Sequence, residues 1–290
     1  MNFGKTMLLT AIIAVLPSLA VAAPAPSKIP VLPAIHTTYD VYVGGFHLLT
    51  SNIWFEEQKN AYHVVVRAET DGFIGWLFPW NTILDAHGRI NGKRLEPKEF
   101  YTRDEWDNKP KITTLRFNRK GDVVPEFNPP NTDQNREIVT KAQRRGALDP
   151  VTALLQMLAH VAVDKSCAIP VPVFDGKRRF DITGRDAGYD FTDSDEYGVY
   201  SGNARLCAAD FRMISGEWKD REHANFWKKT ETEAGREPFQ IWLASPAKGL
   251  PELPVRLESG SVAGLVVVHL SSWRYATSAE IKRAAQHVDK

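Results

Sequence analysis

The side chains that could bind a metal are scattered along this chain. Its eight histidines never show the i,i+4 spacing or the His-Glu-x-x-His pattern of a zinc site. One acidic stretch carries oxygen ligands of the kind that Ca²⁺ prefers, from Asp190, Asp193, Asp195 and Glu196. Because this stretch lacks the glycine and the distant glutamate of a calcium loop, we favour a solvated hairpin tip. We therefore expect no metal and no cofactor.

Side chains for covalent or acid–base catalysis are equally scattered. The chain has no Gly-x-Ser-x-Gly elbow for a nucleophilic serine. Asp104 and Glu105 are adjacent on a predicted strand, where successive side chains point to opposite faces, so they make a poor carboxylate pair. We favour a non-catalytic protein. The alternative is a hydrolase whose carboxylates are brought together only by the fold.

The two cysteines, Cys167 and Cys207, are predicted to form a disulfide. An even pair in an exported protein is best explained as a structural bridge. Closing a loop of 40 residues would stabilise the fold by roughly 4 kcal/mol through the lost entropy of the unfolded chain. A metal pair and a redox couple are the alternatives, and neither has the Cys-x-x-Cys spacing.

The segment 72–80 is the most unusual stretch of the chain. It reads Gly-Phe-Ile-Gly-Trp-Leu-Phe-Pro-Trp and does not alternate like a half-buried strand. One interpretation is a crossover between strands that plugs the core. The other is an apolar lip that touches lipid or an apolar ligand, because exposed aromatic patches mark interaction sites. On the second interpretation the ligand-binding residues are Phe73, Trp76, Phe78 and Trp80.

The first 22 residues are predicted to be a removable export signal. A short stretch with one cation, Lys5, precedes an apolar run that Pro17 interrupts and that ends in the small residues Ala20-Val21-Ala22. Cleavage after Ala22 would leave no transmembrane anchor, since an unbroken apolar run of about 20 residues is needed to span a bilayer. We expect the mature protein to work outside the cytoplasm.

The domain organisation follows from the composition and residue pattern of the remaining chain. Residues 23–36 are rich in proline and are predicted to be an extended leader. Residues 37–276 are predicted to form a single β-rich domain, and residues 277–290 a C-terminal tail. The chain has 36 basic and 35 acidic residues, so it lacks the excess of positive charge that is typical of proteins that bind nucleic acid.

Thirteen segments with strand-like patterns fill the domain, separated by short polar connectors. The segment Ala61–Glu69 shows the pattern best, with Tyr62, Val64 and Val66 on one face. The short connectors, among them residues 87–89, 91–93 and 120–122, indicate an antiparallel meander and not βαβ units. The predicted strands lie around 39–43, 47–55, 61–69, 82–86, 99–106, 112–117, 123–127, 171–174, 177–184, 197–209, 239–244, 255–258 and 264–273.

One strong helix interrupts the strands. Asp149 suits the N-cap and Pro150 the first turn. An apolar stripe at helical spacing then follows, made of Val151, Leu154, Leu155, Leu158 and Val161. A weaker polar helix is predicted over 132–145. The tail from Ser278 has helical character but too little apolar surface to dock firmly.

Five short segments carry a resemblance to a known family: Tyr39–Gly45, Leu95–Phe100, Asp149–Leu154, Val173–Arg178 and Leu253–Leu257, with Gly264 beyond. Together they resemble a family of uncharacterised exported proteins of Gram-negative bacteria that is defined only as a domain of unknown function. They span most of the predicted domain. The resemblance implies a periplasmic protein with a long curved antiparallel sheet, similar to the half-barrels of lipoprotein carriers and sigma-factor regulators. It implies no catalytic residues.

These observations lead to a mainly β protein with a long curved antiparallel sheet, a half-barrel or spiral, and one or two helices. The leading functional hypothesis is a non-catalytic envelope-maintenance protein. Its expected partner is an apolar, lipid-like ligand or an envelope polypeptide held in the curved sheet. A hydrolase acting on an envelope polymer and a ligand-free structural scaffold are the alternatives, and a sizeable pocket would count against the scaffold.

Overall fold

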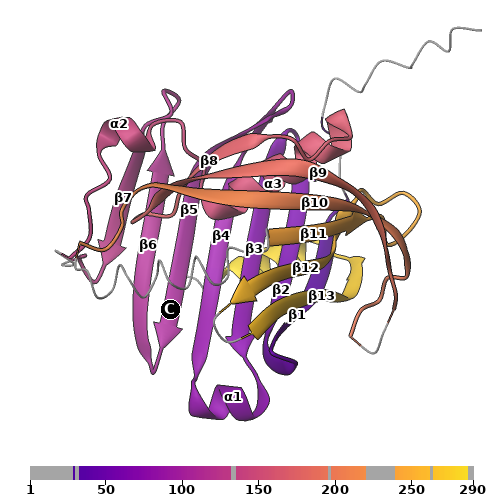
Figure 1. Ribbon diagram of the computed structural model, residues 1–290. Helices are drawn as coiled ribbons and strands as arrows, with labels where there is room; N and C mark the ends of the chain where they lie inside the picture. The colour runs from indigo at the N-terminus through magenta and orange to yellow at the C-terminus, as the bar shows by residue number, and fades with distance from the viewer. Residues whose placement is uncertain are drawn as a thin grey trace, which may run out of the picture.

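The computed structural model describes residue 29 and residues 33–131, 135–194, 197–219, 239–261 and 264–286. The predicted signal peptide, with its cleavage site after Ala22, lies outside the described residues. So do Asp195 and Glu196 of the acidic stretch. The described residues form a mainly β fold built on one antiparallel sheet of 13 strands (Figure 1), which confirms the predicted fold class.

Every predicted strand overlaps an observed one, and most observed strands are longer. The strands are β1 (Ile35–Val43), β2 (Phe46–Gln58), β3 (Ala61–Thr70), β4 (Trp80–Asn91), β5 (Arg94–Trp106), β6 (Lys109–Phe117), β7 (Val123–Asn128), β8 (Pro170–Phe174), β9 (Arg179–Thr192), β10 (Gly202–Ser215), β11 (Phe239–Ala244), β12 (Leu253–Ser261) and β13 (Gly264–Tyr275). The helices among the described residues are α1 (Gly72–Leu77), α2 (Lys141–Arg144), α3 (Pro150–Asp164) and α5 (Ser278–Ala285).

The sheet is a meander whose two halves meet at its centre. Its strand order is β7-β6-β5-β4-β3-β2-β1-β13-β12-β11-β10-β9-β8. The first and last strands therefore pair with each other, from Ile35 opposite Tyr275 to Val43 opposite Val266. The strands at the two edges, β7 and β8, come from the middle of the sequence.

The sheet curls so that its two edges approach each other (Figure 1). Phe174 of β8 is buried in one cluster with Leu115 of β6 and Val123 of β7. The turn after β8 also packs closely on β6. At Gly176, which has φ +102°, a Cβ atom would lie 2.7 Å from Cγ2 of Thr113. The result is a half-closed barrel with a concave inner face.

Helix α3 lies inside this curve, between β8–β10 and the strands of the first half. Asp149 caps its first turn and Pro150 starts it, as the sequence predicts. On one side Ala153 and Met157 pack against β8 and β10. On the other side Val151 and Leu155 contact the inner face of β3 and β5. The helix therefore has apolar contacts on both sides.

The predicted disulfide between Cys167 and Cys207 is present, with 5.8 Å between the two Cα atoms. It joins the segment after α3 to β10, and both cysteines are buried beside Val161 of the helix. The carboxylate of Asp186 accepts a hydrogen bond of 2.9 Å from the backbone N–H of Cys167. The bridge thus fixes the C-terminal end of α3 against the second half of the sheet.

The prediction that the C-terminal tail would not dock is wrong. Helix α5 begins with a capping box between Thr277 and Glu280. Its Ile281 is fully buried against Val65 on the outer face of the sheet. Arg67 donates two hydrogen bonds to the backbone carbonyl of Ala284, at 2.8 and 3.1 Å. A single apolar turn suffices here because β3 presents a matching apolar residue on its outer face.

Two further expectations need correction. Residues 87–89, predicted as a connector, lie within β4, where the pairing with β5 shifts register between His87 and Gly88. A Cβ atom at Gly88 would meet the carbonyl oxygen of Glu96 at 2.3 Å, so glycine serves close packing at a bulge. The helix predicted over 132–145 is only the four-residue α2 in the described part. Four described helices replace the one or two expected.

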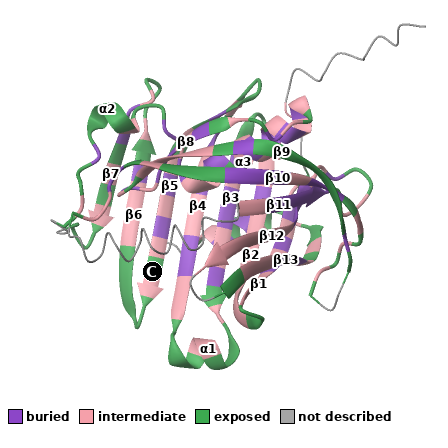
Figure 2. Cartoon of the chain, in the orientation of Figure 1, coloured by how far each residue is buried: buried purple, intermediate pink, exposed green. Residues whose placement is uncertain are grey.

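Buried residues alternate with partly exposed ones along β3 to β5 (Figure 2). The inner residues Tyr62 and Val64 are nearly inaccessible, whereas α1 contains no buried residue. The sheet therefore keeps its core on the concave side and presents α1 to solvent.

Removing the disulfide should destabilise the protein without changing the sheet. Replacing Cys167 and Cys207 together by serine is expected to lower the free energy of unfolding by about 3–4 kcal/mol, because the 40-residue loop gains entropy in the unfolded state. Guanidinium unfolding of oxidised wild type, reduced wild type and the variant measures this effect. Reduced wild type should match the variant. A loss below about 1 kcal/mol would show that the bridge does not restrict the unfolded chain as this account requires.

Candidate functional site

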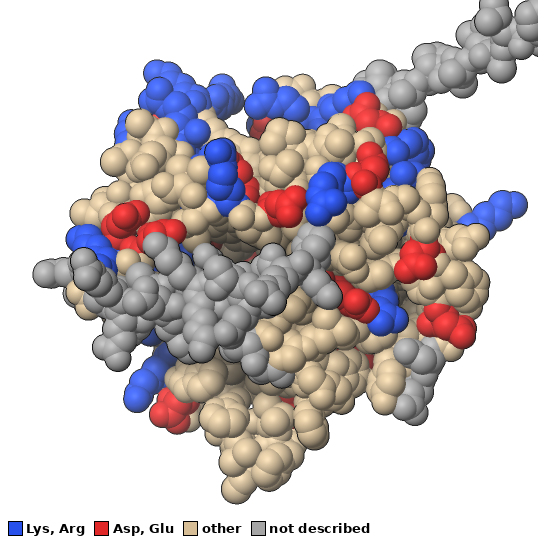
Figure 3. Space-filling view, in the orientation of Figure 1, with Lys and Arg blue, Asp and Glu red and all other residues tan. Residues whose placement is uncertain are grey.

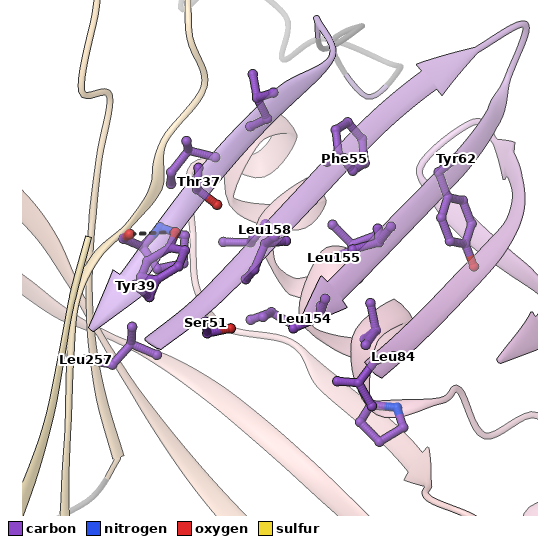
Figure 4. A pocket seen from close by; sticks show the side chains of 18 of the residues that line it. Thr37, Tyr39, Ser51, Phe55, Tyr62, Leu84, Leu154, Leu155, Leu158 and Leu257 are labelled. Carbon is purple, nitrogen blue, oxygen red and sulfur yellow. Dashed lines mark hydrogen bonds between the residues drawn. The ribbon is translucent and has the colours of Figure 1, made fainter. Parts of the chain in front are cut away.

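A cavity of about 490 Å³ lies between α3 and the concave face of β1–β4. The alternation of the strands supplies its wall, since every second residue points inward. Strand β3 contributes Tyr62, Val64 and Val66, the face that the sequence pattern grouped together. Strands β12 and β13 close one side with Leu257 and Val268. Figure 4 shows side chains from these strands and from α3 converging on one space.

Most of the predicted apolar stripe of α3 faces this cavity. Leu154, Leu155 and Leu158 all line it and lie opposite the inner side chains of the strands (Figure 4). Leu154 retains 37% of its accessible surface, so the space in front of it is unfilled. Four of the five residues predicted from helical spacing line the cavity, whereas the fifth, Val161, packs against the disulfide and β11. The structure adds that much of the stripe borders empty space.

The polar groups in the wall are largely bonded to the protein. The Tyr39 hydroxyl donates to the carbonyl of Pro254 at 3.0 Å, and that of Tyr62 lies 2.8 Å from Oγ1 of Thr152. Burial raises the pKa of both tyrosines well above the usual range, so both stay protonated. Thr82 donates to Asp104 at 2.6 Å. The wall therefore offers mainly apolar contact.

Two carboxylates also border the cavity, Glu57 and Glu252. Glu252 is bound by the guanidinium of Arg205, with 2.9 Å from Nε to Oε2. Arg205 also donates to the carbonyl of Lys165 at the end of α3. This carboxylate therefore helps to hold the helix in place.

Asp149 is a buried charge at the start of α3. Its Oδ1 accepts a hydrogen bond of 2.8 Å from the backbone N–H of Thr152, whereas Oδ2 has no hydrogen-bond partner in the described part of the chain. Burial raises the pKa of this carboxyl to about 6, and the hydrogen bonds from Thr152 offset only part of that effect. The cap is thus sensitive to mildly acidic pH.

The four aromatic residues singled out in the sequence occupy two different positions. Phe73, Trp76 and Phe78 lie in or next to α1 and expose 70%, 75% and 51% of their surface. They do not plug the core. Trp80 begins β4 and lines the cavity. A role for all four in ligand binding remains a prediction.

The outer face of the sheet carries a separate group of titratable side chains. His63 lies 3.1 Å from Asp85, and His87 lies 3.8 Å from the same carboxylate. Burial alone would lower the pKa of His63, but the hydrogen bond and charge of Asp85 raise it overall. Since the side chains of β3 alternate, His63 points away from the cavity that Tyr62 and Val64 line. Within the described residues, no cluster of histidine, cysteine or acidic side chains is arranged to hold a metal.

The remaining sequence candidates take part in local structure. Thr82 engages Asp104, while Glu105 forms an ion pair with Arg103 on the opposite face of β5. Asp190 accepts a hydrogen bond of 3.0 Å from the indole of Trp242. These carboxylates are therefore not brought together as a catalytic pair.

Ser245 and Lys248 stand at the Ser-x-x-Lys spacing of some serine hydrolases, a spacing that offers a nucleophile only if the serine is free. The Ser245 hydroxyl instead lies within hydrogen-bonding distance of the carbonyls of Ala247 and Leu250, at 2.6 and 2.7 Å. It closes the turn between β11 and β12.

The feature that sequence reasoning missed is the cavity itself. Its lining residues look like core residues in the sequence, and only the curl of the sheet leaves a space between them. No helix in the described ranges is long and apolar enough to cross a membrane.

Comparison with known proteins identifies a family but no activity. Residues 38–271 match the family described as "Protein of unknown function (DUF3108)". No curated protein matches the chain significantly. A crystal structure of a beta-barrel-like protein of domain of unknown function DUF1849 from Brucella abortus is similar at 10% identity and TM-score 0.49, covering 85% of this chain and 99% of that one. A putative lipoprotein from Parabacteroides distasonis aligns at 10% identity and TM-score 0.29, covering 87% of this chain and all of the other.

Replacing Asp149 by asparagine should change how stability depends on pH. A carboxyl whose pKa is raised to about 6 on folding makes the native state lose stability as pH rises from about 4 to 6. Asparagine caps a helix equally well and carries no charge. The variant should therefore gain stability relative to wild type between pH 4.5 and 7.5, on the order of 2 kcal/mol.

Urea unfolding of both proteins at the two pH values measures this difference. Asp149→Ala is the control, because it loses the cap as well as the charge and should fall below asparagine by about 1 kcal/mol at either pH. An identical difference between wild type and Asp149→Asn at both pH values would show that the carboxyl is not perturbed.

Proposed function

Because the chain belongs to the DUF3108 family, whose function is unknown, we propose its role from the cavity: it binds an apolar, chain-like ligand between α3 and the concave sheet. We further propose that it does so as a non-catalytic protein of the periplasm, in support of the cell envelope. The observation that carries the proposal is the unfilled apolar cavity. A ligand-free scaffold would have no need of one.

The size and lining of the cavity suit a small hydrophobic molecule. A volume of about 490 Å³ falls within the range of sites that enclose ligands, roughly 300–1,000 Å³. Leu154, Leu155 and Leu158 on one side face Val64 and Val66 on the other. Each square ångström of apolar surface removed from water contributes about 25 cal/mol, so a flexible hydrocarbon chain gains stability along the whole wall.

The bonding of the polar groups favours an apolar ligand over an envelope polypeptide. A polypeptide brings one N–H and one C=O per residue, and each needs a partner when buried. The hydroxyls of Tyr39 and Tyr62 and the carboxylate of Glu252 are already engaged. A hydrocarbon chain makes no such demand, and its polar end can stay in solvent.

The proposed location has two supports. The first residues carry the pattern of a cleavable export signal. The second support is the disulfide between Cys167 and Cys207, a bond that persists in oxidising compartments such as the periplasm. Both agree with a protein that works in the periplasm.

Ligand binding is tested by filling the cavity from α3. Leu154→Trp adds a ring to a side chain that already borders free space, so the fold should tolerate it while the ligand loses room. Binding of the fluorescent fatty acid cis-parinaric acid should weaken by about tenfold or more, since the ring displaces buried hydrocarbon. Native mass spectrometry of the purified wild type should show a bound apolar molecule that the variant lacks.

Val124→Trp is the matched control, because Val124 is also half-exposed and lies on β7 outside the cavity wall. It should bind the probe like wild type. Wild type that neither binds cis-parinaric acid nor retains an apolar molecule would refute the proposal, as would equal binding by Leu154→Trp.

A further inference from the structure

The strands of the half-barrel end in turns on two opposite sides. One of these two sides, which we call the apolar edge, is apolar, and we propose that it docks onto the surface of a lipid bilayer. This apolar edge consists of Phe46, Phe73, Trp76, Leu77, Phe78, Trp106 and Leu265. The inference concerns a surface outside the cavity and does not depend on the identity of any ligand.

The topology explains why these residues gather. In an antiparallel meander, every second turn lies at the same end of the strands. Val43 at the end of β1 pairs with both Phe46 of β2 and Val266 of β13. Farther along, Trp80 of β4 pairs with Trp106 of β5. The turns β12–β13, β1–β2, β3–β4 and β5–β6 therefore share one edge, and α1 projects from its middle (Figure 1).

The aromatic rings form contacts with one another while remaining accessible. The ring centroids of Phe73 and Trp76 are 5.8 Å apart, and those of Phe78 and Trp106 are 6.3 Å apart. Phe46 and Trp76 each expose 75% of their surface. A large exposed apolar patch on a folded protein marks a surface that meets another apolar phase.

Charge is distributed unequally between the apolar edge and the opposite edge, where the other turns lie. Residues 72–80 contain no charged side chain. The turns at the opposite edge contain Lys59, Lys93 and the pair Arg119-Lys120. In Figure 3 the lower end, where α1 lies, is almost free of charged groups, whereas cationic side chains crowd the upper end. The molecule thus has one polar and one apolar end.

The shape of the apolar edge favours a bilayer over a protein partner. A stable protein interface buries about 800 Å² on each side and needs a complementary surface. Here a single short helix projects outward, and a fluid lipid surface adapts to it without a fitted hollow. Tryptophan is enriched where proteins meet the membrane interface. In the adjacent hairpin the exposed Lys109 is paired with Trp106 across the two strands and lies 3.7 Å from the carboxylate of Asp107, so this turn adds no net charge to the apolar edge.

The apolar edge is continuous with the cavity. Trp80 follows the exposed segment directly and lines the cavity together with Thr82. Leu49 and Ala68 also line it, and they pair with Thr70 and Thr82 close to the same ends of their strands. When the protein docks through its apolar edge, this end of the cavity would therefore lie next to the lipid.

Vesicle binding by the full mature chain tests the proposal. Wild type should co-sediment with vesicles of phosphatidylethanolamine and phosphatidylglycerol, and its tryptophan emission should shift to the blue. The double variant Phe73→Ser, Trp76→Ser should bind them about tenfold more weakly or worse, because two exposed rings no longer enter the lipid. Since neither side chain lines the cavity, the variant should still bind cis-parinaric acid.

The control double variant Phe191→Ser, Tyr275→Ser removes two rings of similar exposure away from the apolar edge and should bind vesicles like wild type. Leu154→Trp should also keep vesicle binding, so that failure of docking and failure of ligand binding can be told apart. Wild type that stays in the supernatant would overturn the proposal, as would equal sedimentation of the Phe73→Ser, Trp76→Ser variant. Co-purification of an envelope protein through the same residues, without vesicle binding, would replace the bilayer by a protein partner.

Discussion

The cavity exists because α3 is held across the concave face by contacts along its length. Near its N-terminal end, Thr152 contacts the Tyr62 hydroxyl, and Gln156 exchanges two hydrogen bonds with the backbone of Lys93 and Leu95. Beyond its C-terminal end, the disulfide at Cys167 and the hydrogen bond from Arg205 to the carbonyl of Lys165 fix the chain to β10. A helix held in this way cannot collapse onto β1 and β2, so the leucines between its ends face open space.

This arrangement separates stability from function within one element. Ala153, Met157 and Val161 pack tightly on the second half of the sheet, which secures the helix. Leu154 lines the cavity and keeps 37% of its surface accessible, so it remains available to a ligand. Leu158 lines the cavity too, although it also packs against the cluster around Val161. Cavities in protein cores lose dispersion contacts and transfer free energy, and each one lowers stability unless something fills it. The anchors at both ends of α3 offset that loss.

The sequence predicted the elements well because their determinants are local. Period-two alternation located the strands, Asp149 and Pro150 located the start of α3, and an even cysteine pair predicted the bridge. The errors arose where the local structure depends on contacts with a segment that is distant in the sequence. The docking of α5 depends on Val65 from another part of the chain, and the bulge at Gly88 depends on the close approach of Glu96. Leucines at helical spacing look the same in a sequence whether they meet another side chain or a cavity.

The segment 72–80 combines two roles that the sequence alone could not separate. Its first part forms α1, where Asp71 caps the helix and no side chain is buried, so its aromatic residues add little to the stability of the core. Its last residue, Trp80, belongs to the cavity wall. Exposed aromatic rings favour aggregation, so their presence next to a residue of the cavity wall is consistent with an apolar phase on the outside. The exposed segment and the apolar cavity wall thus adjoin in the chain at Trp80.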